Sequence, residues 1–139
     1  MFCLDTNVIV FALNKRRPAM DTRLRAELAA GSRLIVPTIV LIELRYGIAR
    51  SARREASADL LDTFLAAGFE IAPFDVEDSQ EAGDIRAELA DAGITIGPYD
   101  VLIAAQARRR NLVLVTDNRR EFERVPGLMV TDWGAGPSG

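Results

Sequence analysis

The sequence predicts an α/β domain built around a parallel sheet, because short apolar runs alternate along the chain with longer segments of helical character. The chain has 139 residues, which is the size of one domain, and it contains no internal repeat and no linker between domains. We therefore expect a single domain over residues 1–133 and a flexible C-terminal tail over residues 134–139.

The apolar runs are short, as buried strands are, and polar residues follow several of them. In a parallel sheet the carboxyl ends of the strands meet at one edge, so the polar residues that follow them gather there. The expected strands cover residues 2–4, 34–36, 69–72, 112–115 and 128–130.

The helices are marked by capping residues at their starts and by glycines at their ends. We expect Thr6 or Asn7 to cap the first helix, Thr38 the third and Asp75 the fifth, and Pro98 to occupy the first position of the last. The expected helices cover residues 8–13, 18–31, 38–47, 53–67 and 75–93, and a further one begins at residue 98.

The residue types that the chain lacks exclude several kinds of chemistry. It has no histidine, which excludes Ser-His-Asp and Cys-His catalysis and histidine metal sites. Cys3 is its one cysteine, so it has no internal disulfide and no thiolate metal cage. It also lacks the glycine-rich loops that bind nucleotide phosphates. Any catalysis must therefore depend on carboxylates, which suit hard cations such as Mg²⁺ or Mn²⁺.

Four acids stand out by their positions. Asp5 and Asp117 follow expected strands, and Asp100 lies in the first turn of the helix that Pro98 opens, where a negative charge is favoured. Glu43 lies in the apolar run 39–44, on a helix that we expect to be buried nearly all round. A buried carboxylate must be hydrogen-bonded, paired, bound to a metal or protonated. Helix capping, turns and favourable first-turn charge are the alternative roles for these acids, and Glu43 fits them least well.

Carboxylates that share a pocket repel one another and raise their own pKa values unless a cation lies between them. A bound Mg²⁺ would remove this repulsion and position water for attack on a phosphate. The four acids together therefore indicate a metal site that acts on an anionic substrate.

The net charge of −3 is unusual for a protein that binds nucleic acid, but the four acids account for more than all of it, and the remainder carries +1. Sixteen of the seventeen basic residues are arginine, whose planar group binds phosphate through two oxygens. Several could form a phosphate-binding surface, although solvated helix faces are the alternative. These arginines are Arg45, Arg50, Arg53 and Arg54, then Arg108, Arg109 and Arg110, then Arg119 and Arg120.

At these residues the chain resembles the PIN-domain ribonucleases, and among them the VapC-type toxins of bacterial toxin–antitoxin pairs. The resemblance extends from residues 4–7 (LDTN) to residues 132–133. Its other landmarks are Glu43-Leu44 followed by Tyr46-Gly47, then residues 96–105, then residues 114–118 followed by Glu121-Phe122. LDTN alone would be a weak signal, whereas the ordered set at these separations is strong.

The resemblance implies a PIN-like sandwich with a central parallel sheet of about five strands flanked by helices. It implies a metal-dependent endoribonuclease that uses Mg²⁺, or Mn²⁺ in its place, acts on RNA, is neutralised by a cognate antitoxin and forms a homodimer. The family's acids fall on Asp5, Glu43, Asp100 and Asp117. Asp5 and Asp100 would bind the metal directly, whereas Glu43 and Asp117 would bind it directly or through water, and either of these two could orient the attacking water. Thr6, Asn7, Thr116 and Asn118 would orient the carboxylates.

Two other functions remain open from the sequence. A catalytically silent PIN-like module would bind RNA or protein without cleaving it. A receiver domain phosphorylated on aspartate also has a doubly wound sheet with clustered acids, but it needs a late lysine, and the only lysine here is Lys15. No apolar run reaches the roughly 18 residues of a membrane span, and Asp5 interrupts any secretory signal, so we expect a cytoplasmic protein.

Overall fold

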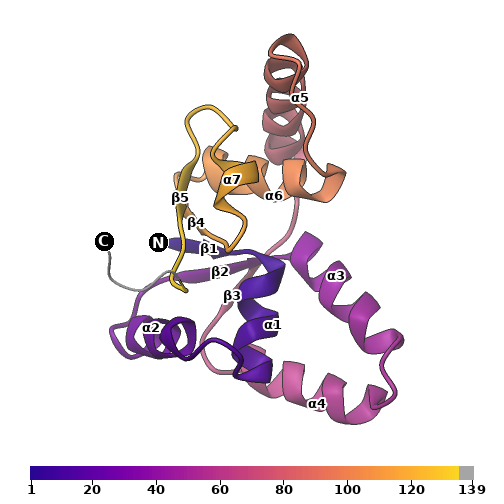
Figure 1. Ribbon diagram of the computed structural model, residues 1–139, viewed down its shortest axis with the longest axis vertical. Coiled ribbons are helices and arrows are strands. Elements are labelled where there is room, and N and C mark those ends of the chain that lie inside the picture. Colours follow the sequence, from indigo (N-terminus) through magenta and orange to yellow (C-terminus); the bar gives the residue numbers. More distant parts are fainter. Residues whose placement is uncertain (135–139) are drawn as a thin grey trace.

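A five-stranded parallel sheet forms the centre of the computed structural model, which describes residues 1–134 (Figure 1). The strands lie in the order β3-β2-β1-β4-β5, so the direction of winding reverses between β1 and β4. The sheet, with helices on both sides, confirms the predicted α/β fold. The strands are β1 (Phe2–Leu4), β2 (Leu34–Pro37), β3 (Glu70–Ala72), β4 (Val113–Val115) and β5 (Met129–Thr131). Apart from Gly134, the expected tail lies outside the described residues.

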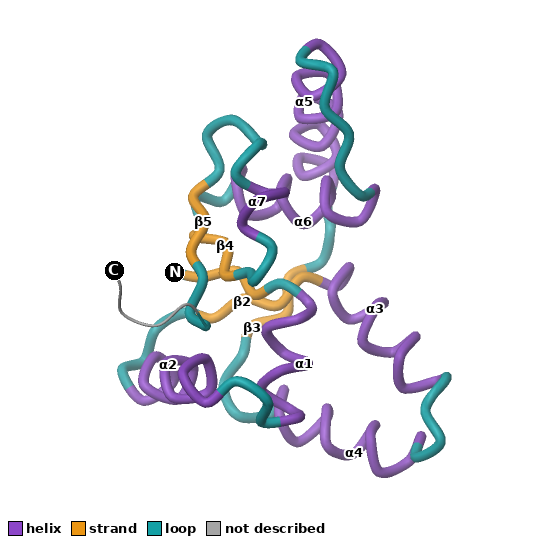
Figure 2. Tube along the Cα trace, viewed as in Figure 1, coloured by secondary structure: helices purple, strands orange, loops and turns teal. Residues whose placement is uncertain are grey.

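In the view of Figure 1, α5, α6 and α7 lie above the sheet and α1, α2 and α4 lie below it, with α3 extending to one side; Figure 2 shows the same elements as a tube. Within residues 1–134, every helix is too short or too polar to span a bilayer. The helices are α1 (Thr6–Asn14), α2 (Pro18–Ala29), α3 (Thr38–Ala49), α4 (Arg54–Leu65), α5 (Val76–Asp91), α6 (Pro98–Arg109) and α7 (Arg119–Phe122).

The helix starts partly confirm the predicted caps. Asp75 caps α5 through a reciprocal capping box with Asp78, as its position suggested. The prediction for α1 was wrong, because Asp5 caps that helix and Thr6 is its first residue. Thr38 does not cap α3 either; it is the first helical residue, and Pro37 takes the cap position without a side-chain bond. The short helix α7 was not predicted.

Helix α6 packs tightly because its inner face carries small residues. Ala104, Ala105 and Ala107 are completely buried, which allows the helix backbone to approach β4 closely. Helix α6 packs most extensively against α5, where Arg109 and Arg110 donate to the completely buried carboxylate of Asp78 at 2.6 and 2.8 Å. This packing holds the N-terminus of α6, and with it Asp100, in a fixed position relative to the sheet.

Candidate active site

The site is built at the carboxyl edge of the sheet, where the winding direction reverses. Strands β1 and β4 are paired with Leu4 opposite Val115, so Asp5 and Thr116 leave the sheet next to each other. The Thr116 hydroxyl donates to Oδ2 of Asp5 at 2.8 Å, and the backbone N–H of Thr6 donates to Oδ1 at 2.8 Å. Both oxygens of Asp5 are therefore held by the strand ends and the first turn of α1.

Burial is the main influence on Asp5, which is only 7% exposed. It raises the pKa of the carboxyl above its ordinary value, and the nearby charges of Glu43 and Asp117 raise it further. The hydrogen bonds from Thr116 and Thr6 favour the ionised form and oppose this rise. Asp5 is thus a desolvated carboxylate among like charges, which is the condition that a cation would relieve.

Glu43 reaches the same edge from α3. The hydroxyl of Thr6 donates to its Oε1 at 2.8 Å, which links the acid to the start of α1. The expectation that this helix is buried nearly all round was wrong, because Ile42 is 49% exposed and Glu43 itself is only partly buried. The space beside Gly47, four residues after Glu43 on the same helix, is open, since a methyl group there would meet nothing within 4 Å.

Asp100 lies in the first turn of α6 and shares a hydrogen bond with Glu121 of α7. Burial, then this bond and the charge of Glu121, raise the pKa of Asp100 to about 8, and the charges of Asp5 and Glu43 add to the rise. The same bond lowers the pKa of Glu121. The two shifts run in opposite directions, as expected for two carboxyl groups that compete for one proton.

Glu121 is a fifth acid of the site, and it was not among the four acids predicted from the sequence. Both of its oxygens are occupied, since Gly97 N–H donates to Oε1 at 3.1 Å and the Asn118 side-chain amide donates to Oε2 at 2.9 Å. Its proximity to Asp100 depends on the packing of α7 against the loop before α6. Its position four residues after Asp117, within the landmark Glu121-Phe122, was the one signal in the sequence.

The remaining predicted residues also lie at this edge. Asp117 is partly buried and accepts a longer bond, 3.4 Å, from the Asn7 side-chain amide. Asn118 contacts the site in two ways: its N–H donates to the Thr116 hydroxyl at 2.9 Å, and its amide holds Glu121. The structure therefore brings all four predicted acids and the four predicted polar residues into one neighbourhood.

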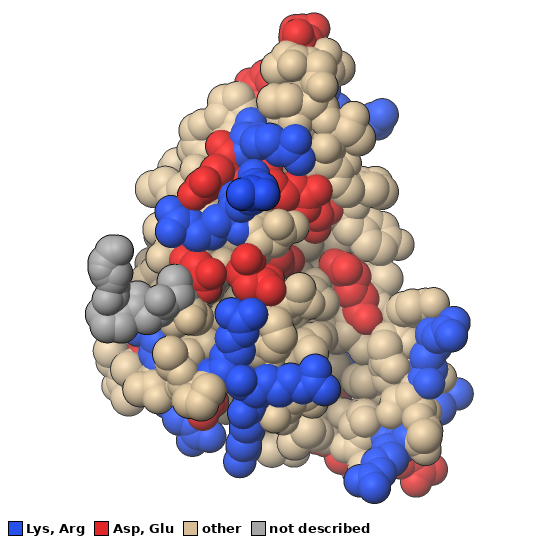
Figure 3. All heavy atoms as spheres, in the orientation of Figure 1, with Lys and Arg blue, Asp and Glu red and all other residues tan. Residues whose placement is uncertain are grey.

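The acids form an oxygen-only set without a basic partner. Within residues 1–134, none of Asp5, Glu43, Asp100, Asp117 and Glu121 forms an ion pair with lysine or arginine. Figure 3 shows acidic side chains in the middle of one face, with basic side chains on either side of them. Among the same residues, no group of three or more acids is arranged closely enough to hold a metal ion. Hard oxygen donors that lie near one another without a counter-charge are of the kind that Mg²⁺ and Mn²⁺ bind.

Comparison with known proteins agrees with this arrangement. The model of the PIN domain family matches residues 2–128, which include every acid of the site. The crystal structure of VapBC2 from Rickettsia felis, bound to a promoter DNA fragment, superposes with a TM-score of 0.88 at 36% identity and covers 95% of this chain and 98% of that one. The DNA-bound VapBC from Salmonella typhimurium superposes with a TM-score of 0.87 at 37% identity over 95% and 97% of the two chains. The chain belongs to the PIN-domain family.

Proteins similar in sequence indicate which group within the PIN-domain family this chain resembles. The tRNA(fMet)-specific endonuclease VapC of Salmonella typhimurium is 38% identical over 132 residues, which are 95% of this chain and 97% of the relative. Ribonuclease VapC2 of Rickettsia felis is 38% identical over 133 residues, which are 96% and 98% of the two chains. This similarity over nearly the full length confirms the resemblance and places the chain among the VapC-type ribonucleases.

Proposed function

We propose that the chain is the metal-dependent endoribonuclease toxin of a type II toxin–antitoxin pair, acting in the cytoplasm through the single domain of residues 1–133. One observation carries the proposal: five acids lie together at the switch point of the sheet without a basic partner within residues 1–134. The names of the relatives, which are ribonucleases and endonucleases, support RNA as the substrate.

In this proposal Asp5 and Asp100 bind Mg²⁺ directly, with Mn²⁺ as a substitute, and Glu43 and Asp117 bind it directly or through water. When bound, the cation supplies positive charge that stabilises the negative charge developing on the phosphate. Thr116 and Thr6 hold Asp5 and Glu43 in position, Asn7 holds Asp117, and Asn118 acts through Glu121.

The side chains have distinct tasks beyond ligation. Oε1 of Glu43 is held by the Thr6 hydroxyl, and Oε2 makes no hydrogen bond within residues 1–134, so Oε2 is available to bind the attacking water. Cation binding would favour the ionised form of Asp100 and would therefore release its proton to solvent. Buried donors to Asp5 keep its carboxylate in place while the substrate enters.

A cognate antitoxin is the proposed protein partner, since the solved relatives at 36% and 37% identity are VapBC complexes. A groove of about 330 Å³ between α1, α3 and α4 would receive it. Glu43 lies at this groove, and the remaining wall is mostly apolar, with Leu13, Ile48 and Leu60 among its residues. A bound segment would therefore reach the site as well as cover apolar surface. The chain would also pair as a homodimer, which sedimentation of the purified toxin would detect.

Cleavage of a mixed RNA pool tests the proposed activity. Purified protein freed of antitoxin should cleave RNA in Mg²⁺ or Mn²⁺ and should stop when chelator is added. Asp5→Asn and Asp100→Asn should lose cleavage while keeping a native circular dichroism spectrum. Asp59→Asn makes the same chemical change at an exposed position of α4 and should remain active. Full activity in Asp100→Asn would overturn the site, and chelator-insensitive RNA binding without product would indicate the silent binding module instead.

A further inference from the structure

The arginines divide into two groups by their partners. Within residues 1–134, eight of them form ion pairs with acids, and these include Arg108, Arg109 and Arg110, which hold α6 to acids at 75, 78, 81 and 88 on and before α5. These three arginines are therefore engaged in holding α6 against α5, which makes them weaker candidates for a phosphate surface. The other paired arginines are Arg23, Arg25, Arg33, Arg45 and Arg119.

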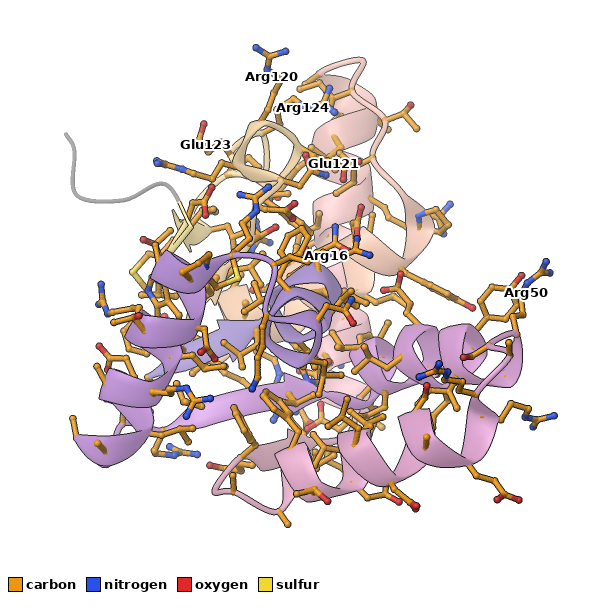
Figure 4. All side chains as sticks on the ribbon, turned by 60° about the horizontal axis from the view of Figure 1, so that its bottom comes forward. Arg16, Arg50, Arg120, Glu121, Glu123 and Arg124 are labelled. Carbon is orange, nitrogen blue, oxygen red and sulfur yellow. The ribbon has the colours of Figure 1, made fainter. Side chains whose placement is uncertain are left out.

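The basic residues without an acid partner in the described part of the chain lie mostly in three clusters. Arg120 lies on α7 and Arg124 lies two residues after it, and these two are called the α7 arginines below. The α1–α2 turn holds Lys15, Arg16 and Arg17, and the α3–α4 turn holds Arg50, Arg53 and Arg54. Arg86 on α5 stands apart from them. In Figure 4, Arg120 and Arg124 project beyond Glu121 on the α7 side, while Arg16 and Arg50 lie towards the ends of α1 and α3.

The α7 arginines lie directly beside the acids. Arg120 and Arg124 line one surface hollow together with Asn118 and Glu121, and Arg124 also donates to the carbonyl of Thr95 at 3.4 Å. Neither arginine forms an ion pair within residues 1–134, so both guanidinium groups are available to an anionic ligand. A phosphate beside the one being cleaved would fit between these arginines.

Arg16 lies on the opposite side of the acids. Helix α1 begins directly after Asp5 and has nine residues, so at 1.5 Å per residue its far end lies about 14 Å from that acid. This length corresponds to about four nucleotides at roughly 3.4 Å each along a stacked strand. Lys15, Arg16 and Arg17 are all exposed at this turn. The guanidinium of Arg17 lies 4.6 Å from the centre of the Phe11 ring, so Arg16 is the arginine here without such a contact within residues 1–134.

The α3–α4 turn is separated from the acids by apolar surface. The groove beside Glu43 is lined by Ile48, Ser51 and Leu60 on the way to this turn, and Arg50 is occupied with Tyr46, whose ring centre lies 5.7 Å away. An RNA backbone gains little from crossing such a surface, so we leave these arginines out of the RNA path.

We propose that the RNA backbone crosses the acids from the α7 arginines to Arg16, and that these three arginines bind the phosphates on the two sides of the cleaved bond. This inference rests on the proposed function and specifies its substrate-binding surface. Because the arginines contact only phosphates, they set the register of the RNA and contribute equally to all sequences.

The test is the salt dependence of RNA binding. A fluorescein-labelled RNA of random sequence, 12 nucleotides long, is titrated with protein that carries Asp100→Asn so that the RNA stays intact. Each lost phosphate contact should lower the slope of log K against log salt by about 0.7 and weaken binding about fourfold at 0.15 M salt. The triple variant R16Q/R120Q/R124Q should therefore lose about 2 from the slope and bind about fiftyfold more weakly.

The matched control is R50Q/R53Q/R54Q, which removes the same charge from the α3–α4 turn and should change the slope by less than about 0.7. Equal effects of the two triple variants would overturn the proposal, because they would indicate attraction to the net charge alone. Unchanged RNA binding in the first variant, with weaker neutralisation by antitoxin, would also overturn it and assign the arginines to the antitoxin. Binding is measured without cleavage, so failure of the nuclease proposal would appear separately, as an intact RNA pool with the salt slopes still as expected.

Discussion

Thr116 offers the sharpest test of how the site is held together. Its side chain is completely buried, donates to Oδ2 of Asp5 at 2.8 Å and accepts from Asn118 N–H at 2.9 Å. Thr116→Val removes the hydroxyl and nearly keeps the shape. The lost bond to an ionised carboxylate is worth about 1.5–3 kcal/mol, and an unpaired N–H adds about 1 kcal/mol. We expect the free energy of unfolding to fall by about 2–4 kcal/mol and Mn²⁺ affinity to fall about 10- to 100-fold.

Urea unfolding and Mn²⁺ titration followed by electron paramagnetic resonance would measure the two effects. Thr116→Ser is the control, because it keeps the hydroxyl and loses one buried methyl group worth about 1 kcal/mol. We expect the Ser variant to bind Mn²⁺ within about threefold of the wild type, since the donor that orients Asp5 remains. Wild-type Mn²⁺ affinity in a folded Val variant would refute the role of Thr116 in orienting Asp5.

Three further predictions concern Asp100 and the packing of α6. In Gly97→Ala the new methyl carbon would lie 3.0 Å from Oδ2 of Asp100 and would displace this carboxylate from its position. RNA cleavage in Mn²⁺ should therefore slow about tenfold or more, with little change in melting temperature. An unchanged rate would show that the carboxylate of Asp100 can move without loss of activity. Burial raises the pKa of Asp78, but hydrogen bonds from Arg110, the Asp75 backbone and Arg109 outweigh it and lower the pKa to about 2. Asp78→Asn should therefore lower the free energy of unfolding at pH 7, measured in urea, by about 2 kcal/mol. The difference from the wild type should shrink as pH falls from 4 to 2, because the unfolded wild-type chain takes up the proton before the folded one does. The pKa of Asp100 is raised to about 8, so between pH 4 and pH 8 the folded metal-free protein keeps a proton that the unfolded chain has lost. Melting temperatures in chelator should therefore fall from pH 4 to pH 8, and Asp100→Asn should flatten this dependence. A rise in wild-type stability over that range would contradict the raised pKa of Asp100.

The regular elements could be predicted because their signals are local. Apolar runs predicted all five strands, and Pro98 and Asp75 marked helix starts that the structure confirms. Local signals did not identify the capping residue where several neighbouring residues could cap the same helix. Asp5, Thr6 and Asn7 are all good capping residues, and only the geometry at the end of β1 selects Asp5. Helix α7 has four residues and little apolar periodicity, so no pattern indicated it.

The acids of the site that follow strands or interrupt an apolar run could be predicted from the sequence. Asp5 and Asp117 follow strands, and an acid in the apolar run of α3 needed a special environment, so the sequence indicated all three. Glu121 joins the site through contacts with Gly97 and Asp100, more than 20 residues away, which no local pattern contains. The pairing of Arg108 with Glu81 is equally distant, and charge runs alone do not separate paired arginines from unpaired ones.

The central claim is that the acids at this edge bind the cation on which RNA cleavage depends. The most direct measurement follows Mn²⁺ binding and RNA cleavage in the same antitoxin-free preparation as Mn²⁺ is raised. We expect cleavage to rise with the same midpoint as binding, and both to be lost in Asp5→Asn and Asp100→Asn but kept in Asp59→Asn. Cleavage that reaches its full rate before Mn²⁺ binds, or tight Mn²⁺ binding that survives in both site variants, would contradict the claim.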